Sequence, residues 1–408
     1  MNCRHCRSEL TLPLVNLGSA PPSNAYLTRE NLHEPETYFP LRVLVCERCW
    51  LVQTEDFARA AELFHADYAY FSSFSTSWLA HCNDYVADMV GRFDLNEKSY
   101  VIEVAANDGY LLDFFKSRNI ACAGIEPTES TAAAARAKGH KILVEFFGVR
   151  LARTLALGGA YADLTVANNV LAHVPDINDF VAGFKIILKP QGIATFEFPH
   201  LLRLIVDTQF DTIYHEHFSY LSLTAVTEIF AANGLVVFDV QELPTHGGSL
   251  RVFAQRKDTG TRNISDAVGL LLHSERQAGI CRAAYYADFQ ARAEKVKDDF
   301  VDFLIQAKRA KKTVAAYGAA AKGNTLMNFA GIRPDLISYV VDKNPAKQGQ
   351  FMPGSHLPIM PPAKLREKNI DFLVILPWNI APEVKKQNAW LAAQGTKFVT
   401  VVPKLEIS

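Results

Sequence analysis

Short apolar runs alternate with helix-forming segments in two separate blocks of this chain, and this alternation constrains the fold more than any other feature. In the first block, from about residue 98 to 255, the apolar runs include YVIEVAA, ACAGIEP, DLTVANNV and GIATFEFP. In the second block they are TVAAYGAAAKG, LISYVVDKN, DFLVILPWN and KFVTVVP. Such alternation is typical of a mainly parallel sheet with helices on both faces. The sequence therefore predicts two doubly wound α/β modules, of which the first ends in an antiparallel pair of strands.

A cysteine-bearing zone precedes these blocks, and a long helical segment at about 264–310 separates them. The chain has 408 residues, enough for two or three domains of about 150 residues each. We predict a small N-terminal domain at residues 1–75, a Rossmann-like core at 76–258 and a second Rossmann-like domain at 259–408.

Charge and cysteine usage narrow the class of protein. Lys and Arg number 42 and Asp and Glu number 43, so no net basic charge favours nucleic acid or an anionic membrane as a partner. The N-terminus lacks the apolar core of a signal peptide, and no apolar run reaches the length of about 18 residues that a membrane-spanning helix needs. We expect a cytoplasmic enzyme, whose oligomeric state does not follow from the sequence.

Four of the seven cysteines form two CxxC pairs and are the candidate metal ligands: Cys3, Cys6, Cys46 and Cys49. This pattern indicates a reducing compartment and a metal site rather than a disulfide framework. Two CxxC turns can place four thiolates around a tetrahedral Zn²⁺, and four thiolates leave no open coordination position. The sequence therefore predicts structural zinc, against the alternative of unrelated buried thiols.

The loop after the first strand of the first block has an acidic character. The strand at 100–104 leads into Ala105-Ala106-Asn107-Asp108-Gly109 and then a helix, and Glu103 and Asp108 would face a ligand there. Carboxylates repel phosphate but suit a ligand with a cationic, amino-acid-like end. S-adenosylmethionine has such an end, with its sulfonium and ammonium groups. The next strand ends at Glu126, where a carboxylate can accept both ribose hydroxyls.

Polar residues at the end of the following strand extend this site along the carboxyl edge, where open sheets bind ligands. The pattern favours a class I methyltransferase core over a non-catalytic α/β module. The predicted cofactor-binding residues are Glu103, Ala105, Asn107, Asp108, Gly109, Glu126, Asn168, Asn169 and His173.

A segment rich in histidine and aromatic residues, FDTIYHEHFSY at 210–220, is the candidate catalytic segment. Imidazole and charged groups among aromatic rings favour perturbed pKa values, as a general base requires. His217 and His215 are rival bases, which share a face if the segment is extended. Metal binding through these two histidines, or an ordinary loop role for both, are the alternatives.

A loop in the second block, Tyr317 to Thr325, follows a strand and opens a helix. Its small residues allow close approach of an anion, and the helix N-terminus and Lys322 favour negative charge. The frame Gly318 to Gly323 is followed by Asn324 where a Walker A loop needs Lys, so ATP hydrolysis is not predicted. NAD is a competing ligand, because Asp342 could contact a ribose.

Taken together, the motifs resemble the nucleotide-sugar C-methyltransferases of deoxysugar biosynthesis, which methylate C-3 of a 4-keto sugar. The resemblance covers essentially the whole chain. It is carried by the N-terminal CxxC, CERCWLVQ at 46–53, YAYFSS at 68–73, EVAANDGYLL, FDTIYHEHFSYLS, PTHGGSLR at 244–251 and YGAAAKGN at 317–324.

The resemblance implies that the first domain binds structural zinc, the second S-adenosylmethionine and the third the nucleotide sugar. His217 would match the catalytic base, with Tyr214, Glu216 and Tyr70 in the same pocket. His215 stands where a member of that family has Asp, and this difference affects which sugar hydroxyls the enzyme recognises. The expected substrate-binding residues are His246, Gly247, Tyr317, Gly318, Lys322, Asn324, Asp342 and Asn379.

We therefore predict an S-adenosylmethionine-dependent C-methyltransferase that acts on C-3 of a nucleotide-linked 4-keto-6-deoxy sugar. A ketone at C-4 acidifies the C-3 hydrogen, so one base suffices to form an enolate and no catalytic metal is needed. Tyr214 would hydrogen-bond the C-4 oxygen as charge develops there. A zinc-ribbon methyltransferase that modifies nucleic acid and a non-catalytic assembly factor are the alternatives.

Overall fold

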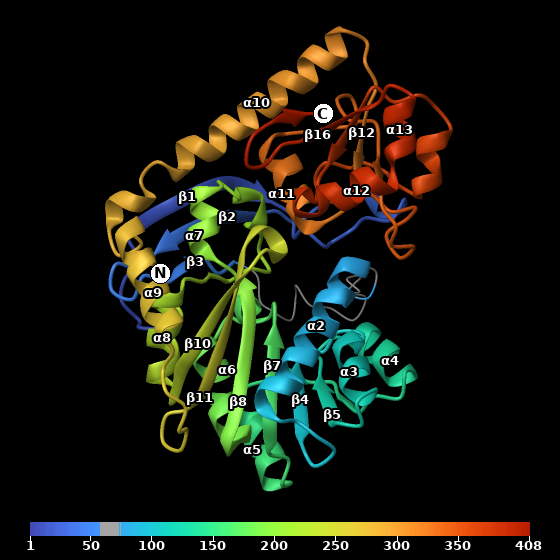
Figure 1. Ribbon diagram of the computed structural model, residues 1–408. Coiled ribbons are helices and arrows are strands. Elements are labelled where there is room, and N and C mark those ends of the chain that lie inside the picture. Colours follow the sequence, from blue (N-terminus) through green and yellow to red (C-terminus); the bar gives the residue numbers. More distant parts are fainter. Residues whose placement is uncertain (58–72, 74) are drawn as a thin grey trace.

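The computed structural model describes residues 1–57, 73 and 75–408, and its strands form three sheets. Figure 1 shows the N-terminal sheet in blue above the seven-stranded sheet, with the C-terminal module in orange and red at the top. Tyr70, expected in the catalytic pocket, lies outside the described residues. Among the described residues, none of the helices combines the length and apolarity that a bilayer crossing requires.

The N-terminal sheet is antiparallel, in the order β1-β2-β3-β9. Its strands are β1 (Leu12–Ala20), β2 (Phe39–Val45), β3 (Val52–Thr54) and β9 (Ser219–Tyr220). In β2 every second residue is buried, as expected of a strand with one face on a core. Strand β9 is contributed by the candidate catalytic segment, so this segment hydrogen-bonds directly to the edge of the N-terminal sheet.

The seven-stranded sheet has the order β10-β11-β8-β7-β4-β5-β6. Strands β4 to β8 are parallel, and β11 is antiparallel to both β8 and β10, which confirms the predicted closing pair. The strands are β4 (Tyr100–Val104), β5 (Ala121–Ile125), β6 (Ile142–Leu143), β7 (Ala162–Asn168), β8 (Leu188–Pro199), β10 (Leu235–Leu243) and β11 (Ser249–Arg256).

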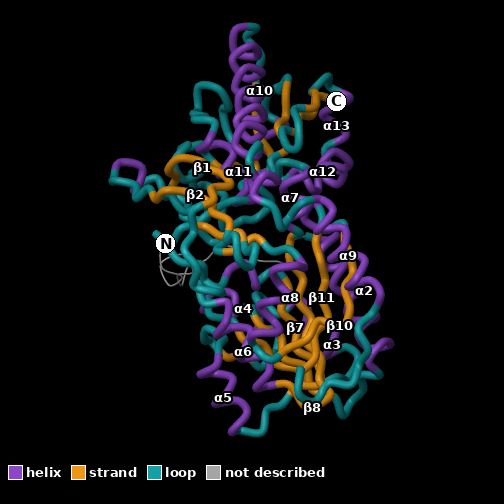
Figure 2. Tube along the Cα trace, turned by 90° about the vertical axis from the view of Figure 1, so that its left-hand side faces the viewer, coloured by secondary structure: helices purple, strands orange, loops and turns teal. Residues whose placement is uncertain are grey.

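Helices cover both faces of this sheet, as the views in Figures 1 and 2 show. Neighbouring strand residues Val101 and Ile102 point into different core clusters, one shared with α2 and α3 and the other with α6 and α8. Helix α2 begins where the Ser75 side chain accepts the Trp78 amide. The helices are α2 (Thr76–Phe93), α3 (Tyr110–Lys116), α4 (Glu129–Ala137), α5 (Val149–Leu157), α6 (Ile177–Ile187), α7 (Leu201–Val206) and α8 (Leu223–Ala232).

The predicted helical segment at 264–310 is two helices, α9 (Asp266–Ala278) and α10 (Phe289–Arg309). Gly279 ends α9 with a φ of 104°, a left-handed conformation that favours glycine. Helix α9 packs back on β10 of the seven-stranded sheet, whereas α10 packs on β1 of the N-terminal sheet. The segment therefore bridges the two sheets instead of separating two modules.

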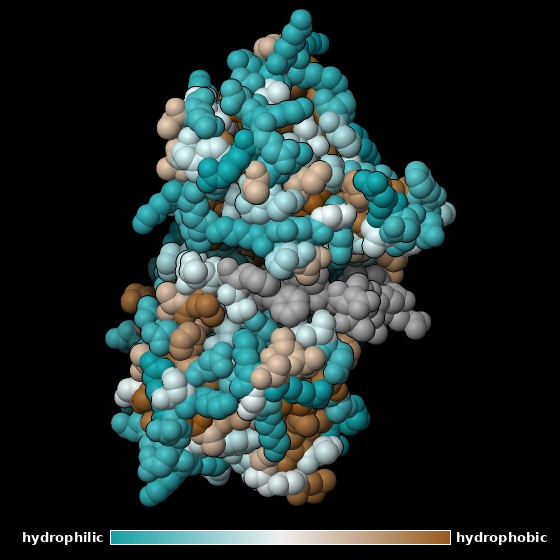
Figure 3. Space-filling model, turned by 90° about the vertical axis from the view of Figure 1, so that its right-hand side faces the viewer, coloured by the Kyte–Doolittle hydropathy of each residue, from teal (hydrophilic) through white to brown (hydrophobic). Residues whose placement is uncertain are grey.

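The C-terminal module is the second predicted doubly wound sheet, in the order β14-β13-β12-β15-β16-β17. All its pairs are parallel except the last, and its outer face in Figure 3 is mainly hydrophilic. The elements are β12 (Val314–Tyr317), α11 (Ala321–Phe329), β13 (Val340–Val341), β14 (Ile359–Met360), β15 (Phe372–Ile375), α12 (Ala381–Gln387), α13 (Ala389–Ala393), β16 (Lys397–Thr400) and β17 (Glu406–Ile407).

Candidate active site

The four predicted metal ligands form one cluster. Their sulfur atoms all lie within 4.8 Å of one another, with 3.6 Å between Cys3 and Cys49 and 3.5 Å between Cys6 and Cys46. A tetrahedron with zinc–sulfur bonds of 2.3 Å has edges of about 3.8 Å, so the cluster fits a Zn²⁺ ion. Three of the four cysteines are buried in the same core as the seven-stranded sheet. The zinc site is therefore part of the packing between domains.

The acidic loop after β4 is tightly folded. Ala105, Asn107 and Gly109 all have positive φ angles, of 61°, 49° and 75°. A Cβ atom on Gly109 would lie 2.8 Å from the His140 ring and 3.0 Å from the Cβ of Ala135, so only glycine fits between α3 and α4. This close approach packs the start of α3 against the C-terminal end of α4.

Glu126, at the end of β5, is bonded to this loop. One carboxylate oxygen accepts the Asn107 amide at 2.9 Å, and the other accepts the Thr128 amide at 3.0 Å. Burial raises the pKa of Glu126, and these hydrogen bonds act in the opposite direction. The carboxylate predicted to bind a ribose thus also holds the loop in shape.

Several buried polar atoms at this sheet edge have no hydrogen-bond partner among the described residues. They are Glu103 Oε2, Asp108 Oδ1, Asn168 Oδ1 and Nδ2, and Asn169 Oδ1. Burial and the neighbouring carboxylates of Glu126 and Asp108 raise the pKa of Glu103 well above its usual value. Buried polar groups are almost always hydrogen-bonded, so this group, four acceptors and one amide donor, fits a polar ligand with a cationic end. S-adenosylmethionine is such a ligand.

Tyr214 and His217 form a hydrogen-bonded pair in the catalytic segment. The Tyr214 hydroxyl lies 2.7 Å from His217 Nε2, and His217 Nδ1 donates to the Thr212 carbonyl at 2.8 Å. Because Nδ1 carries the proton, Nε2 is the acceptor and faces the phenol. Burial lowers the pKa of His217 well below its usual value, so the imidazole is neutral at neutral pH.

His173 joins this pair to the cofactor edge. It follows β7 in a short 3₁₀ turn, and its ring centroid lies 4.6 Å from that of His217. Its Nδ1 donates to the Glu216 carbonyl at 2.9 Å, and burial lowers its pKa to about 4. The predicted cofactor residue and the predicted base are therefore neighbours.

The remaining residues of the segment point elsewhere, because it is not extended. The His217 amide donates to the Tyr214 carbonyl and closes a turn, so His215 and His217 do not share a face. His215 Nε2 lies 3.2 Å from the carbonyls of Phe39 and Pro40 in the N-terminal sheet. Among the described residues, the only cluster suited to a metal is the four cysteines, so the histidine-metal alternative gains no support.

Glu216 faces the N-terminal domain. The Asn24 side-chain nitrogen donates to both of its carboxylate oxygens, at 2.7 and 2.8 Å. Asn24 precedes the 3₁₀ turn η1 (Asn31–His33), and no local sequence pattern indicates this contact across 192 residues. The N-terminal domain thus reaches the catalytic segment.

The C-terminal module contacts the same segment. Trp378 donates its indole N–H to Asp211 at 2.7 Å, and Lys322 donates to Asn379 at 2.7 Å. The ammonium of Lys322 lies 4.6 Å from the centre of the Trp378 ring. Lys322 and Asn379, both predicted to bind substrate, are therefore side by side.

Other predicted substrate residues lie around this contact. His246 has a φ of 57° and its ring is 5.3 Å from that of Trp78 on α2. A Cβ atom on Gly247 would lie 2.3 Å from the Trp378 ring, so this glycine allows the tryptophan to insert. Tyr317 ends β12 and is buried beneath the loop.

The loop after β12 is closed by contacts within the chain. Gly318 lies against Pro377, where a Cβ atom would come within 2.5 Å. Asp342 accepts the Ala319 amide at 2.7 Å. The buried Asn324 donates towards the Ser23 carbonyl at 3.5 Å.

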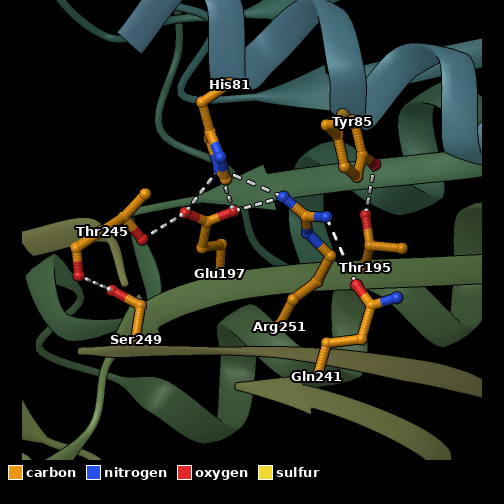
Figure 4. Close-up of polar contacts among 8 residues, drawn as sticks. All are labelled: His81, Tyr85, Thr195, Glu197, Gln241, Thr245, Ser249 and Arg251. Carbon is orange, nitrogen blue, oxygen red and sulfur yellow. Dashed lines mark hydrogen bonds and ion pairs between the residues drawn. The ribbon is translucent and has the colours of Figure 1, made fainter. Parts of the chain in front are cut away.

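A buried ionic network at the end of β8 was not predicted from the sequence (Figure 4). Both oxygens of Glu197 lie 2.9 Å from His81 Nε2, and one accepts Arg251 at 2.8 Å and the other Thr245 at 3.1 Å. The Arg251 guanidinium also lies over the Tyr85 ring. Glu197 and Arg251 lie opposite one another because β8 and β11 pair in antiparallel register, which no local sequence pattern specifies.

This network fixes helix α2 beside the cofactor edge. Glu197 is fully buried and pairs in register with Asn168, whose side chain belongs to the unpartnered group described above. His81 stacks on Trp78 at 5.1 Å, and Trp78 lies 6.3 Å from Tyr110 at the start of α3. The charged and aromatic groups of α2 therefore border the cofactor loop.

Known proteins match this arrangement domain by domain. Family models match a zinc binding domain at residues 3–64, a methyltransferase domain at 78–240 and a C-methyltransferase C-terminal domain at 244–403. The C-methyltransferase NovU of Streptomyces niveus is 33% identical over 402 residues, which cover 98% of this chain and 95% of NovU. The chain belongs to this C-methyltransferase family. The enzyme takes its methyl group from S-adenosylmethionine and holds zinc in its four-cysteine cluster, as the sequence predicted.

Solved structures also resemble this C-methyltransferase over part of its length. The PH0226 protein from Pyrococcus horikoshii OT3 aligns over 50% of this chain and 100% of its own, at 13% identity and a TM-score of 0.39. The magnesium protoporphyrin IX methyltransferase ChlM from Synechocystis PCC 6803 with bound SAM aligns over 44% of this chain and 79% of its own, at 14% identity and a TM-score of 0.33.

Proposed function

We propose that this C-methyltransferase methylates C-3 of a nucleotide-linked 4-keto-6-deoxy sugar, with His217 as the base. The observation that carries the proposal is the Tyr214–His217 pair, in which a phenol meets the one imidazole nitrogen that carries no proton. A base next to a hydrogen-bond donor suits a substrate that loses a C–H proton while charge develops on an adjacent carbonyl oxygen. A carbon nucleophile requires such a step.

His217 removes the C-3 proton through Nε2, and the electron pair moves onto the C-4 oxygen. The Tyr214 hydroxyl turns from Nε2 to that oxygen when the sugar binds, which frees the base and stabilises the enolate. The Thr212 carbonyl keeps the imidazole ring fixed through Nδ1 in both protonation states. S-adenosylmethionine supplies the electrophilic methyl group.

The lowered pKa of His217 keeps the base unprotonated when the substrate arrives. Once the proton has been taken, the negative charge of the enolate favours the imidazolium, because an opposite charge nearby stabilises the charged form. Glu216, with its carboxylate held by Asn24, accepts sugar hydroxyls in this proposal. The nucleotide lies toward the C-terminal module, which meets the catalytic segment at Asp211.

The test is deuterium exchange, followed by NMR, on dTDP-linked and UDP-linked 4-keto-6-deoxyglucose in deuterated water with S-adenosylhomocysteine. The parent enzyme should exchange the C-3 hydrogen and, with S-adenosylmethionine, place the methyl group on C-3. Because a C-4 ketone acidifies the hydrogens at both C-3 and C-5, exchange and methylation at C-5 would overturn the C-3 assignment. If the enzyme methylates the sugar but exchanges neither the C-3 nor the C-5 hydrogen, a reversible proton transfer to the base is excluded.

A further inference from the structure

Lys322 is a cation in the active-site wall that makes no ion pair with a described carboxylate. Its ammonium donates to the amide oxygen of Asn379 and lies over the Trp378 ring. The carboxylate near it, Asp211, is instead the acceptor of the Trp378 indole. Asp211 therefore acts on Lys322 only as a nearby charge, and the groups that the ammonium contacts are neutral. A cation with neutral contacts is suited to an anion that forms during the reaction.

We infer that Lys322 is a catalytic residue that binds the C-4 oxygen of the sugar and stabilises the enolate, rather than a ligand of the diphosphate. The inference rests on the proposed function and deepens it. In the reaction the C-3 proton moves to His217 Nε2 and the electron pair moves to the C-4 oxygen, next to the Lys322 ammonium. When C-3 of the enolate attacks the sulfonium methyl group, the C-4 carbonyl re-forms, the new C–C bond forms and the methyl–sulfur bond breaks, so that S-adenosylhomocysteine leaves. Lys322 keeps its proton throughout.

The first support is the face of helix α11 on which Lys322 lies. Residues three apart on a helix are neighbours, so Lys322 and Thr325 share a face. The Thr325 hydroxyl donates to the Ile213 carbonyl at 2.9 Å, one residue before Tyr214. This face of α11 is therefore packed on the segment that carries the Tyr214–His217 pair.

The second support is the contact through Trp378. Its indole is bonded to Asp211, and the next residue, Thr212, accepts the Nδ1 proton of His217. The Trp378 ring thus lies between the ammonium of Lys322 and the backbone that holds the base. Consistent with this geometry, the positive charge of Lys322 contributes to lowering the pKa of both His217 and His246.

The third support is that the loop predicted to bind phosphate uses its own amides. The Gly318 amide donates to the Val341 carbonyl, the Ala319 amide to Asp342 and the Ala320 amide to the Gly318 carbonyl. A phosphate-binding loop uses such backbone amides to bind its ligand. Here these three donors already have acceptors within the chain and are not available to a phosphate.

The outer side of the same loop is covered as well. The Ala319 carbonyl accepts the Tyr26 hydroxyl at 2.6 Å and the Lys347 ammonium at 2.8 Å. The loop is thus an anchor for the N-terminal domain, and Lys322 projects from the helix that follows it.

Steady-state kinetics of Lys322→Met, Lys322→Gln and Lys322→Arg separate the two roles. We expect Lys322→Met to lower kcat about 100-fold, the usual cost of one oxyanion donor, with KM for the 4-keto sugar nucleotide nearly unchanged. The rate of C-3 exchange should fall in parallel, while calorimetric affinity for dTDP or UDP stays the same. Lys322→Gln, which can still bond Asn379, covers the case in which Met impairs folding, and Lys322→Arg should recover part of kcat.

The matched control is Lys347→Met, which removes a buried lysine bonded to the Ala319 carbonyl of the loop and should change stability more than kcat. If Lys322→Met instead shows a large rise in KM, an unchanged kcat and weaker nucleoside diphosphate binding, Lys322 is a ligand of the diphosphate and the inference is wrong. If the parent enzyme and Lys322→Met exchange the C-3 hydrogen equally fast, only this inference is overturned. A parent that never exchanges C-3 overturns the proposed function instead.

Discussion

The two doubly wound modules of this enzyme share one construction and use it differently. In each, the acid that ends the second strand accepts an amide from the loop after the first strand: Glu126 from Asn107 at 2.9 Å, and Asp342 from Ala319 at 2.7 Å. The first loop is bordered by buried carboxyl and amide atoms without described partners, whereas the amides of Gly318, Ala319 and Ala320 in the second are bonded within the chain. If Lys322 acts on the C-4 oxygen as inferred above, loop geometry alone does not identify a ligand site, and unpartnered polar atoms are the better guide.

The largest expected effect lies where the two modules meet, at His217. His217→Asn removes the base but retains a side chain of similar polarity, so methylation and C-3 exchange should both fall by about 10²–10⁴-fold. Binding of S-adenosylmethionine and of the sugar nucleotide, measured by calorimetry, should persist. His215→Asn is the matched control, since that imidazole faces the N-terminal sheet. If C-3 exchange is lost in His215→Asn but persists in His217→Asn, His215 is the base.

The second effect concerns the zinc site, which belongs to neither module but packs against the first. Cys46→Ser removes a thiolate ligand, so we expect less than half an equivalent of zinc and a Tm lower by about 5–10 °C. Cys281→Ser removes a free cysteine outside the cluster and should leave both quantities unchanged. Full zinc occupancy in Cys46→Ser by elemental analysis would remove that cysteine from the ligand set.

The third effect tests the comparison itself with a matched pair of variants. Glu126→Ala should weaken S-adenosylmethionine binding by about 1.5–3 kcal/mol, because a charged hydrogen-bond partner of loop and ligand is lost. Asp342→Ala removes the equivalent contact in the second module and should lower Tm without changing cofactor affinity. If Asp342→Ala weakens dTDP or UDP binding to a similar extent, the second loop is a ligand site after all, as the sequence analysis predicted.

Local patterns predicted the elements, the two modules and the four-cysteine cluster, because each depends on residues close together in the sequence. Contacts between distant elements were not predictable. The Asn24–Glu216 and Trp378–Asp211 bonds join residues 192 and 167 positions apart, and the Glu197–Arg251 pair depends on strand register. Similarly, His215 and His217 are equivalent in sequence, and only the turn closed by the His217 amide separates them.

The smallest expected effect is a pH dependence at the contact between the second module and the catalytic segment. Burial raises the pKa of Asp211 to about 6, from a usual value of 3.8, although the Lys322 charge and the Trp378 hydrogen bond act against burial. The native state therefore binds more protons than the unfolded state between pH 4 and 6. As pH rises through this window, the free energy of unfolding falls, by at most about 3 kcal/mol.

Asp211→Asn keeps an acceptor for the Trp378 indole but cannot ionise, so this part of the decline should disappear. Urea unfolding midpoints of the parent and the variant at pH 4.5, 5.5 and 6.5 measure this loss of stability. The variant should gain stability relative to the parent as pH rises, with the greatest gain above pH 6, where the parent carries a buried charge. Parallel pH curves for the two proteins would mean that Asp211 ionises as readily in the native enzyme as in the unfolded chain. Burying the Asp211 carboxylate at the module contact would then cost little free energy, because the positive charge of Lys322 stabilises it.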